Sequence, residues 1–347
     1  MKLIIQVPCF NEAETLPVTL AGLPRRVEGF DQVEWLVVDD GSTDRTSETA
    51  RSLGADHVLR LNKNQGLARA FMAGLEACLV RGADVIVNLD ADNQYAAADI
   101  PRLVRPILEK NADMVIGARP IQDNPHFSWL KKRLQRLGSW VVRVVSRTPV
   151  EDAPSGFRAI SRETALRLNV FSDYTYTLET IVQAGQKNLL IATCPVGVNA
   201  PLRPSRLVKN IWTYISRSMN TMLRIFVVYR PFKFFMTIGL LLFSSGLLLG
   251  LRFLYYLSLG GGKGHVQSLI LASVLLGIGF QTMLTAFLAD LFAVNRKLLE
   301  DIQFRLRAQQ SQGSEGSAVP PHRISHKSSP RAKAPKGTAG RRSLRRD

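Results

Sequence analysis

The sequence predicts an α/β domain with a doubly wound, mostly parallel sheet, followed by an α-helical hairpin that crosses a membrane. Three short apolar runs in the first hundred residues each lead into polar residues, and segments with helical spacing alternate with them. Two longer apolar segments follow toward the carboxyl end, and each has the length that a bilayer requires. The 347 residues therefore divide into an α/β part and a membrane part.

The apolar runs at 3–7, 35–38 and 85–89 are rich in branched residues, which is typical of strands buried on both faces. The third run ends in Asp90 and Asp92, one residue apart. Open α/β sheets bind ligands at the carboxyl edge of their strands, so the polar residues after the three runs should meet there. An isolated Asp-x-Asp pair is more often a solvated turn, but the repeated arrangement favours a site. Two hard oxygen ligands suit Mg²⁺ or Mn²⁺ bound to a diphosphate.

Apolar residues at helical spacing predict helices between these strands, over 12–23, 43–53 and 66–81. Ser42 or Asp44 can cap the second helix. The alternation of strands and helices indicates the doubly wound arrangement, and no internal repeat is evident.

The net charge of +17 predicts an anionic partner, either nucleic acid or an acidic membrane face. Much of this charge lies in residues 305–347, which hold eleven Lys and Arg against two acidic residues. That segment is also rich in Ser, Pro and Gly, so we expect a disordered basic tail. A basic tail beside a bilayer is explained by anionic lipid, so we expect no nucleic-acid partner.

The segments 234–251 and 266–289 carry no charged residue and predict two membrane spans within a hairpin over 232–293. The alternative is a buried core hairpin, but soluble helices seldom stay apolar around the whole circumference for this length. The loop around 260–263 is short, so both flanks should lie on one side of the membrane. Because basic residues flank both outer ends of the hairpin, we expect both termini in the cytoplasm.

The amino terminus and the cysteines also predict a cytosolic α/β part. The first apolar run is too short for a signal peptide. Cys9, Cys78 and Cys194 are unclustered and lack metal-ligand spacing, which fits a reducing compartment. We expect Cys9 to be a packing residue rather than a nucleophile.

Six motifs in the first 160 residues resemble the family 2 glycosyltransferases in their order along the chain. They are VPCFNEAE, DDGSTDRT, NKNQGLARA, DADNQY, GAR and SGFR. The resemblance implies a GT-A catalytic domain over residues 1–205 that uses a nucleotide-activated sugar. A series of motifs in one order is far more specific than any one of them.

The resemblance also implies a donor site. Asp92 and Gln94 would hold the cation against the diphosphate. Phe10 matches a nucleobase contact and has a core role as its alternative, and Arg203, with Arg206 as its alternative, matches a clamp on the diphosphate. The implied nucleotide-sugar contacts are Pro8, Phe10, Asn11, Glu12, Val38, Asp39, Asp40, Asn64, Gly66, Asp90, Ala91, Asp92, Gln94, Arg119 and Arg203.

The predicted membrane segments indicate the class of acceptor substrate. Residues 129–145 and 207–228 interleave cations with apolar residues and predict amphipathic helices on an anionic membrane surface, with ordinary surface helices as the alternative. With residues 206–231 preceding a two-span hairpin, the layout resembles the polyprenyl-phosphate glycosyltransferases. Their acceptor is a lipid monophosphate, and the matching contacts here are Lys131, Arg133 and Ser155.

The same resemblance implies catalytic roles for Asp92, Arg119, Asp152 and Glu179. A lipid phosphate is largely dianionic at neutral pH, so it can attack the anomeric carbon without strong general-base help. In-line attack would invert the anomeric centre. Asp152 or Glu179 could act as a base, although Glu179 could equally be an inert residue on a helix surface.

Three other functions stay open. A processive polysaccharide synthase of the same fold is disfavoured because the chain lacks a Gln-x-x-Arg-Trp motif. A glycolipid synthase acting on a lipid hydroxyl would need a true general base. A non-catalytic membrane module is disfavoured because the acidic motifs are retained. An oligomer also stays open, because small residues in both spans allow close helix contact between chains or within the hairpin, namely Gly239, Gly246, Gly250, Gly277 and Gly279.

Overall fold

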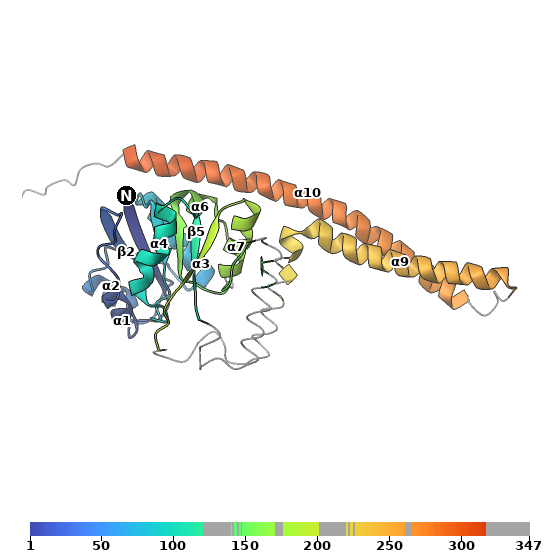
Figure 1. Ribbon diagram of the computed structural model, residues 1–347, viewed down its shortest axis with the longest axis horizontal. Helices are drawn as coiled ribbons and strands as arrows, with labels where there is room; N and C mark the ends of the chain where they lie inside the picture. Colours follow the sequence, from blue (N-terminus) through green and yellow to red (C-terminus); the bar gives the residue numbers. More distant parts are fainter. Residues whose placement is uncertain are drawn as a thin grey trace, which may run out of the picture.

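A seven-stranded sheet organises the first two hundred residues (Figure 1). This computed structural model describes residues 1–120, 140, 142–143, 146, 148–170, 176–200, 220, 223–224, 226–260 and 266–316, with side chains as far as residue 309. The strands are β1 (Lys2–Cys9), β2 (Gln32–Asp39), β3 (His57–Arg60), β4 (Val85–Asn88), β5 (Met114–Ala118), β6 (Arg158–Ser161) and β7 (Ile191–Pro195). Their order in the sheet is β3-β2-β1-β4-β6-β5-β7.

The sheet is parallel except at β6, which pairs antiparallel with both β4 and β5. The other strands all run in one direction, because β1 pairs parallel with β2 and β4, β2 with β3, and β5 with β7. Their carboxyl ends therefore meet at one edge. This confirms the predicted doubly wound, mostly parallel sheet.

Helices cover both faces of the sheet (Figure 1). They are α1 (Leu16–Ala21), α2 (Thr46–Ser52), α3 (Leu67–Val80), η1 (Ala97–Asp99), α4 (Ile100–Leu108), α6 (Arg162–Arg167) and α7 (Thr177–Gln186). On one face α3 buries Phe71 and Leu75 against Ile4 of β1, and on the other α4 buries Leu103 near Ile5. Because both faces are covered, the central strands are continuous apolar runs.

The first two predicted helices begin later than the sequence pattern indicated. Helix α1 begins at Leu16 instead of residue 12, and α2 begins at Thr46 instead of residue 43. The predicted cap of α2 is corrected as well: Arg45 occupies the N-cap position without a side-chain hydrogen bond. Asp44 still accepts from the Thr46 amide at 3.0 Å, but Ser42 accepts from Asn11 in the preceding loop.

Two long helices follow the α/β domain. Helix α9 (Pro231–Ser258) and helix α10 (Val266–Gly316) pack against each other along a hairpin (Figure 1). Each is long and apolar enough to cross a membrane. Only 11% of the most apolar part of α9 and 17% of that of α10 is buried. So little burial does not fit the alternative of a buried core hairpin, since core helices bury most of their apolar surface.

Helix α10 continues past the apolar segment and packs back on the α/β domain (Figure 1). Arg307 donates to the Leu168 carbonyl at 2.8 Å and to Glu76 at 2.9 Å, and Glu300 pairs with Lys187 at 3.0 Å. The predicted tail is thus corrected over residues 305–316, which are helical. The remainder of the tail, and most of the predicted amphipathic segments at 129–145 and 207–228, lie outside the described residues.

The small residues of the hairpin fall into two groups. A Cβ atom at Gly239, Gly246 or Gly279 would lie 2.5–2.9 Å from atoms of the facing helix, so these three glycines permit the close contact of α9 and α10. Gly250 and Gly277 have no described atom within 4 Å of such a Cβ. The predicted role in close helix contact within the hairpin therefore holds for the first group only.

This difference gives a matched pair of substitutions. Gly279→Ala should destabilise the hairpin by roughly 1–3 kcal/mol, because its Cβ would lie 2.5 Å from the Phe243 amide nitrogen. Gly277→Ala should be neutral or stabilising by up to about 1 kcal/mol, since alanine favours helix and meets no neighbour there. Unfolding of the full chain in mixed detergent micelles measures both. Equal effects of the two substitutions would contradict the observed packing.

Candidate active site

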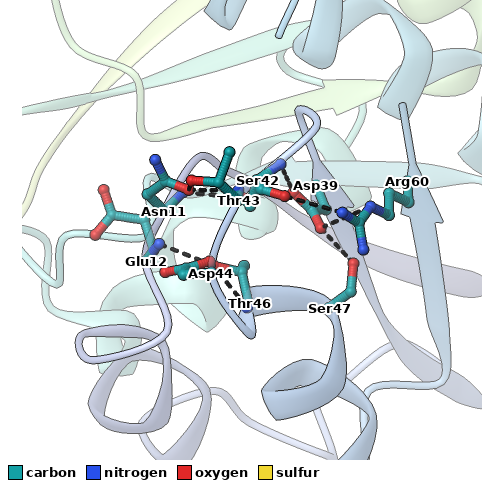
Figure 2. A network of polar contacts seen from close by, with 9 residues as sticks. All are labelled: Asn11, Glu12, Asp39, Ser42, Thr43, Asp44, Thr46, Ser47 and Arg60. Atoms are coloured by element: carbon teal, nitrogen blue, oxygen red, sulfur yellow. Dashed lines mark hydrogen bonds and ion pairs between the residues drawn. The ribbon is translucent and has the colours of Figure 1, made fainter. Parts of the chain in front are cut away.

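The loops after β1 and β2 lock together at the carboxyl edge of the sheet (Figure 2). Asn11 adopts a left-handed backbone with φ of 54°, a conformation that asparagine tolerates better than most residues. Its side-chain oxygen accepts from the Thr43 amide at 2.8 Å, and its own amide donates to the Ser42 hydroxyl at 2.9 Å. These hydrogen bonds hold the Asn-Glu turn and the Gly-Ser-Thr-Asp turn side by side.

Glu12 is anchored one residue further along. Its amide donates to the Thr46 hydroxyl at 2.9 Å, and its carboxylate accepts from the Thr15 hydroxyl at 2.5 Å. The side chain is buried. Figure 2 shows Glu12 beside Asn11, so the two predicted contacts of the first loop lie together.

Asp39 and Asp40, at the end of β2, are both buried and bonded to the loops around them. Asp39 accepts from the Ser42 amide at 2.8 Å and from the Ser47 hydroxyl, and Arg60 lies 3.8 Å from its carboxylate (Figure 2). The hydrogen bonds from Ser42 and Ser47 fix the turn formed by residues 41–46. The carboxyl end of β2 is therefore held rigidly.

Asp40 binds a third loop. Its two carboxylate oxygens accept from the Gln65 and Gly66 amides, each at 2.8 Å. A Cβ at Gly41 would lie 2.4 Å from the Lys63 backbone, so only glycine permits this close approach. Burial raises the pKa of Asp40, and the two amide bonds oppose that rise. Asp40 thereby brings the loop of Asn64 and Gly66 to the sheet edge.

Polar side chains inside β1 and β4 stabilise the carboxyl end of β4. Gln6 and Asn88 are paired in register, and the Gln6 amide donates to the Asn88 side-chain oxygen at 2.9 Å. The Asn88 amide donates to the Gly156 carbonyl and to the Tyr176 hydroxyl, both at 2.8 Å. The network is fully buried, so it fixes the loop at residue 156 against the end of β4.

Asp90 is the most unusual group of this edge. Its Oδ1 atom is buried and has no hydrogen-bond partner among the described residues. Burial, and after it the nearby charge of Asp92, raise the pKa of Asp90 to about 7. A buried carboxylate without a partner is costly, so the residues present fit an added cation or a donor group at this point.

Asp92 and Gln94 lie in the turn after Asp90. Asp92 Oδ1 accepts from the Gln94 amide at 3.2 Å, and Asn93 between them has a left-handed φ of 55°. Asn199 crosses to this turn and donates to the Asn93 carbonyl at 3.1 Å. No three His, Cys, Asp or Glu side chains of the described segments converge on one point, so an ion here would also need oxygens from its ligand.

Arg119 and Asp152 form a bidentate ion pair near the Asp90 turn. Arg119 Nε donates to Asp152 Oδ2 at 2.7 Å and Nη2 donates to Oδ1 at 3.0 Å. The Arg119 guanidinium also lies 5.8 Å from the centre of the Tyr95 ring. Both side chains are nearly buried, and both Asp152 oxygens are engaged by Arg119. In this geometry Asp152 orients Arg119.

Ser155 and its neighbours form a rigid loop. Arg158 is fully buried and donates to the carbonyls of Ser155 at 2.8 Å and Ala153 at 3.0 Å. The Tyr176 ring stacks on Phe71 with centroids 3.9 Å apart, while its hydroxyl reaches the Gly156 carbonyl. Ser155 is therefore held beside the acidic turn, although its own side chain is buried.

The alternative that placed Glu179 on a helix surface is wrong. It is 6% exposed and accepts from the Tyr229 hydroxyl at 3.0 Å. Gln183, one turn further along α7, also donates to that hydroxyl at 3.0 Å. Glu179 thus links α7 to the segment that leads into α9.

The remaining predicted residues lie in or beside the strand ends, or outside the described segments. Pro8 and Val38 are register partners in β1 and β2, and Ala91 is buried beside Asp90. Phe10 is 37% exposed, so its alternative role in the core is wrong. Burial raises the pKa of Cys9 well above its usual value, which fits packing. The predicted contacts Lys131, Arg133 and Arg203 lie outside the described residues.

The residues that pack behind the site and hold its loops in place were not identified from the sequence. Gln6 and Asn88 could have been identified, because each is a polar residue within an otherwise apolar strand. Tyr95 accepts from the Gly156 amide at 3.2 Å, and burial raises its pKa to about 12. Tyr95 and Arg158 lie within the motifs DADNQY and SGFR, but the motifs do not show which contacts these side chains make. Nothing in the local sequence identifies Tyr176 or Asn199, because their partners are 20 and 106 positions away.

The sheet order and the acidic carboxyl edge define an α/β domain with the GT-A fold. Residues 4–168 match the family described as glycosyl transferase family 2. An undecaprenyl-phosphate mannosyltransferase of Micrococcus luteus is 34% identical over 170 residues, covering 47% of this chain and 68% of the relative. The chain belongs to glycosyltransferase family 2 and is a glycosyltransferase.

Two further comparisons agree with this assignment. An uncharacterized protein of Methanocaldococcus jannaschii is 32% identical over 225 residues, covering 63% of this chain and 86% of the relative. The solved glucosyl-3-phosphoglycerate synthase of Mycobacterium tuberculosis, in complex with Mn²⁺, uridine diphosphate and glucosyl-3-phosphoglycerate, superimposes with a TM-score of 0.52. It is 21% identical and covers 65% of this chain and 78% of its own, so this likeness concerns the fold.

The contact of Gly156 with Asp90 yields a prediction. A Cβ at residue 156 would lie 2.4 Å from Asp90 Oδ2 and 2.8 Å from the Tyr176 hydroxyl. Gly156→Ala should therefore displace the Asp90 carboxylate and reduce sugar transfer by about 10- to 100-fold, since small misplacements at a site are costly. Gly22→Ala is the control, because its nearest neighbour would lie at 3.6 Å. Activity and thermal unfolding of both variants test this. Unchanged transfer by Gly156→Ala would contradict the proposed role of the Asp90 turn.

Proposed function

We propose that this glycosyltransferase transfers a sugar from a nucleotide donor to the phosphate of a polyprenyl lipid at a membrane surface, with inversion of the anomeric centre. The proposal rests on the proximity of Asp90, Asp92 and the Arg119–Asp152 pair at one sheet edge, in a chain with two candidate spans. The name of the Micrococcus luteus relative supports the choice of acceptor. So does that of a polyprenol monophosphomannose synthase of Mycolicibacterium smegmatis, 31% identical over 176 residues, 49% of this chain and 65% of that relative.

Donor binding would use the three strand ends. The rigid turns at Asn11, Asp39 and Asp40 would form the floor for base and ribose, with Phe10 exposed at the rim. Asp92 and Gln94 would hold Mg²⁺ or Mn²⁺ with the donor diphosphate. When bound, such a cation supplies positive charge that stabilises the departing nucleoside diphosphate.

Arg119 would provide a fixed cation for the phosphates. Its bidentate hydrogen bonds to Asp152 orient the guanidinium. The Arg119 side chain therefore loses less conformational entropy when a phosphate binds. In the reaction a lipid phosphate oxygen would attack the anomeric carbon, and the bond from that carbon to the donor diphosphate would break. The electron pair leaves on the nucleoside diphosphate, so the step needs no external reactant.

The contacts of the two candidate bases favour a phosphate acceptor over a lipid hydroxyl. Asp152 is engaged by Arg119, and Glu179 accepts from Tyr229. A hydroxyl acceptor needs a base that removes its proton, whereas a phosphate dianion already carries the required charge. The positive flanks of the hairpin lead us to propose that the catalytic domain and both termini face the cytoplasm.

A transfer assay tests the function. The full chain in detergent would receive polyprenyl monophosphate and labelled UDP- or GDP-sugars with Mg²⁺ or Mn²⁺. We expect an acid-labile lipid product that requires the metal, and Asp92→Asn should lower kcat/KM at least about 100-fold, because a metal ion contributes several kcal/mol. Asp31→Asn is the control, since this acid precedes β2 at the opposite edge and is 88% exposed. Label in a neutral lipid or a polymer, with none in the lipid phosphate, would refute the proposed acceptor.

A further inference from the structure

A cavity lies where the α/β domain meets the two long helices. Its volume is about 680 Å³, and it is lined by the end of α7, the start of α9 and residues 290–297 of α10. This volume is within the usual range for small-molecule sites, of roughly 300–1,000 Å³. Tyr229, which the Glu179 contact holds in place, forms part of the wall.

The cavity is strongly basic. Four cationic side chains line it together with one carboxylate, namely Arg230, Lys233, Arg296 and Lys297 with Asp290. Lys233 and Lys297 are exposed, so their ammonium groups can reach a ligand. Arg296 is held in the wall, because it donates to the Val228 carbonyl at 3.1 Å.

The cavity also lies at the end of the apolar segments. Helix α9 becomes apolar immediately after Lys233, and the uncharged stretch of α10 ends just before Asp290. If these helices span a bilayer, the cavity lies at the level of the headgroups on the side of the α/β domain. Basic pockets between spans at that depth bind anionic lipid headgroups.

The cavity lies apart from the catalytic edge. The residues of α7 that line it, at its carboxyl end, lead directly into the amino end of β7. Strand β7 runs in the same direction as β4, whose carboxyl end carries Asp90 and Asp92. The cavity is therefore at the amino edge of the sheet, with roughly 13 Å of strand between the two edges.

We propose that this cavity binds the headgroup of an anionic phospholipid, with the lipid phosphate against Lys233 and Lys297. The site is separate from the sheet edge that carries Asp90 and Asp92, and it goes beyond the proposed function. Its occupant would join α9, α10 and the end of α7 at the membrane surface. Because binding is measured without a sugar donor, the test does not depend on whether the proposed transfer occurs.

Native mass spectrometry of the full chain in detergent tests this site, with phosphatidylglycerol and phosphatidylcholine of identical acyl chains as probes. We expect one phosphatidylglycerol to bind in clear preference to phosphatidylcholine. The double substitution Lys233→Gln and Lys297→Gln should weaken this binding about 25-fold, because each basic residue contributes roughly fivefold at an anionic surface. The control, Lys110→Gln with Arg305→Gln, removes the same charge from exposed positions outside the cavity and should change binding less than about twofold.

Four outcomes would overturn the proposal. The first is equal binding of the two lipids by the unmodified chain, a comparison that needs no variant. The second is an equal loss in the cavity and control variants, once thermal unfolding has shown that both are folded. The third is displacement of the lipid by excess inorganic phosphate, which would identify a free-phosphate site. The fourth is competition by polyprenyl monophosphate, which would identify the cavity as the acceptor site.

Discussion

The burial of several carboxylates at one edge of the sheet is the constraint on which the rest of this structure depends. Asp39 and Asp40 are buried there, as is the Oδ1 atom of Asp90, and a buried charge is stable only when it is paired or hydrogen-bonded. Asp39 and Asp40 meet this requirement within the chain, through backbone amides and hydroxyls. Asp90 does not, and its raised pKa reflects that cost. The edge is therefore shaped to gain stability from a ligand that brings positive charge.

The surrounding fold keeps this costly arrangement in place. The buried Gln6–Asn88 pair connects β1 and β4 below the acidic turn, and Asn88 ties both strands to the loop at Gly156. Arg158 fixes that loop from the other side. The Glu179–Tyr229 hydrogen bond connects α7 to the segment that leads into the long apolar helix α9. The acidic edge of the sheet and the apolar helical hairpin are thus parts of one connected structure.

Much of this arrangement could be predicted from local sequence. Branched apolar runs with acidic ends indicated the central strands, the sheet edge and Asp90 with Asp92, because period and composition are local properties. The antiparallel strand β6, the Arg119–Asp152 pair and the burial of Glu179 could not be predicted, since each depends on contacts between distant segments. The helical residues 305–316 were missed because their Ser- and Gly-rich composition resembles a linker, whereas packing of α10 on the α/β domain stabilises a helix.

Whether the acidic edge holds a divalent cation together with the donor diphosphate can be measured by crystallography at the manganese absorption edge, with the protein bound to Mn²⁺ and UDP or GDP. We expect one anomalous peak against the Asp92 carboxylate, with the nucleotide over the ends of β1 and β2. A nucleotide bound at this edge without a manganese peak, or a manganese peak away from Asp92, would contradict this expectation.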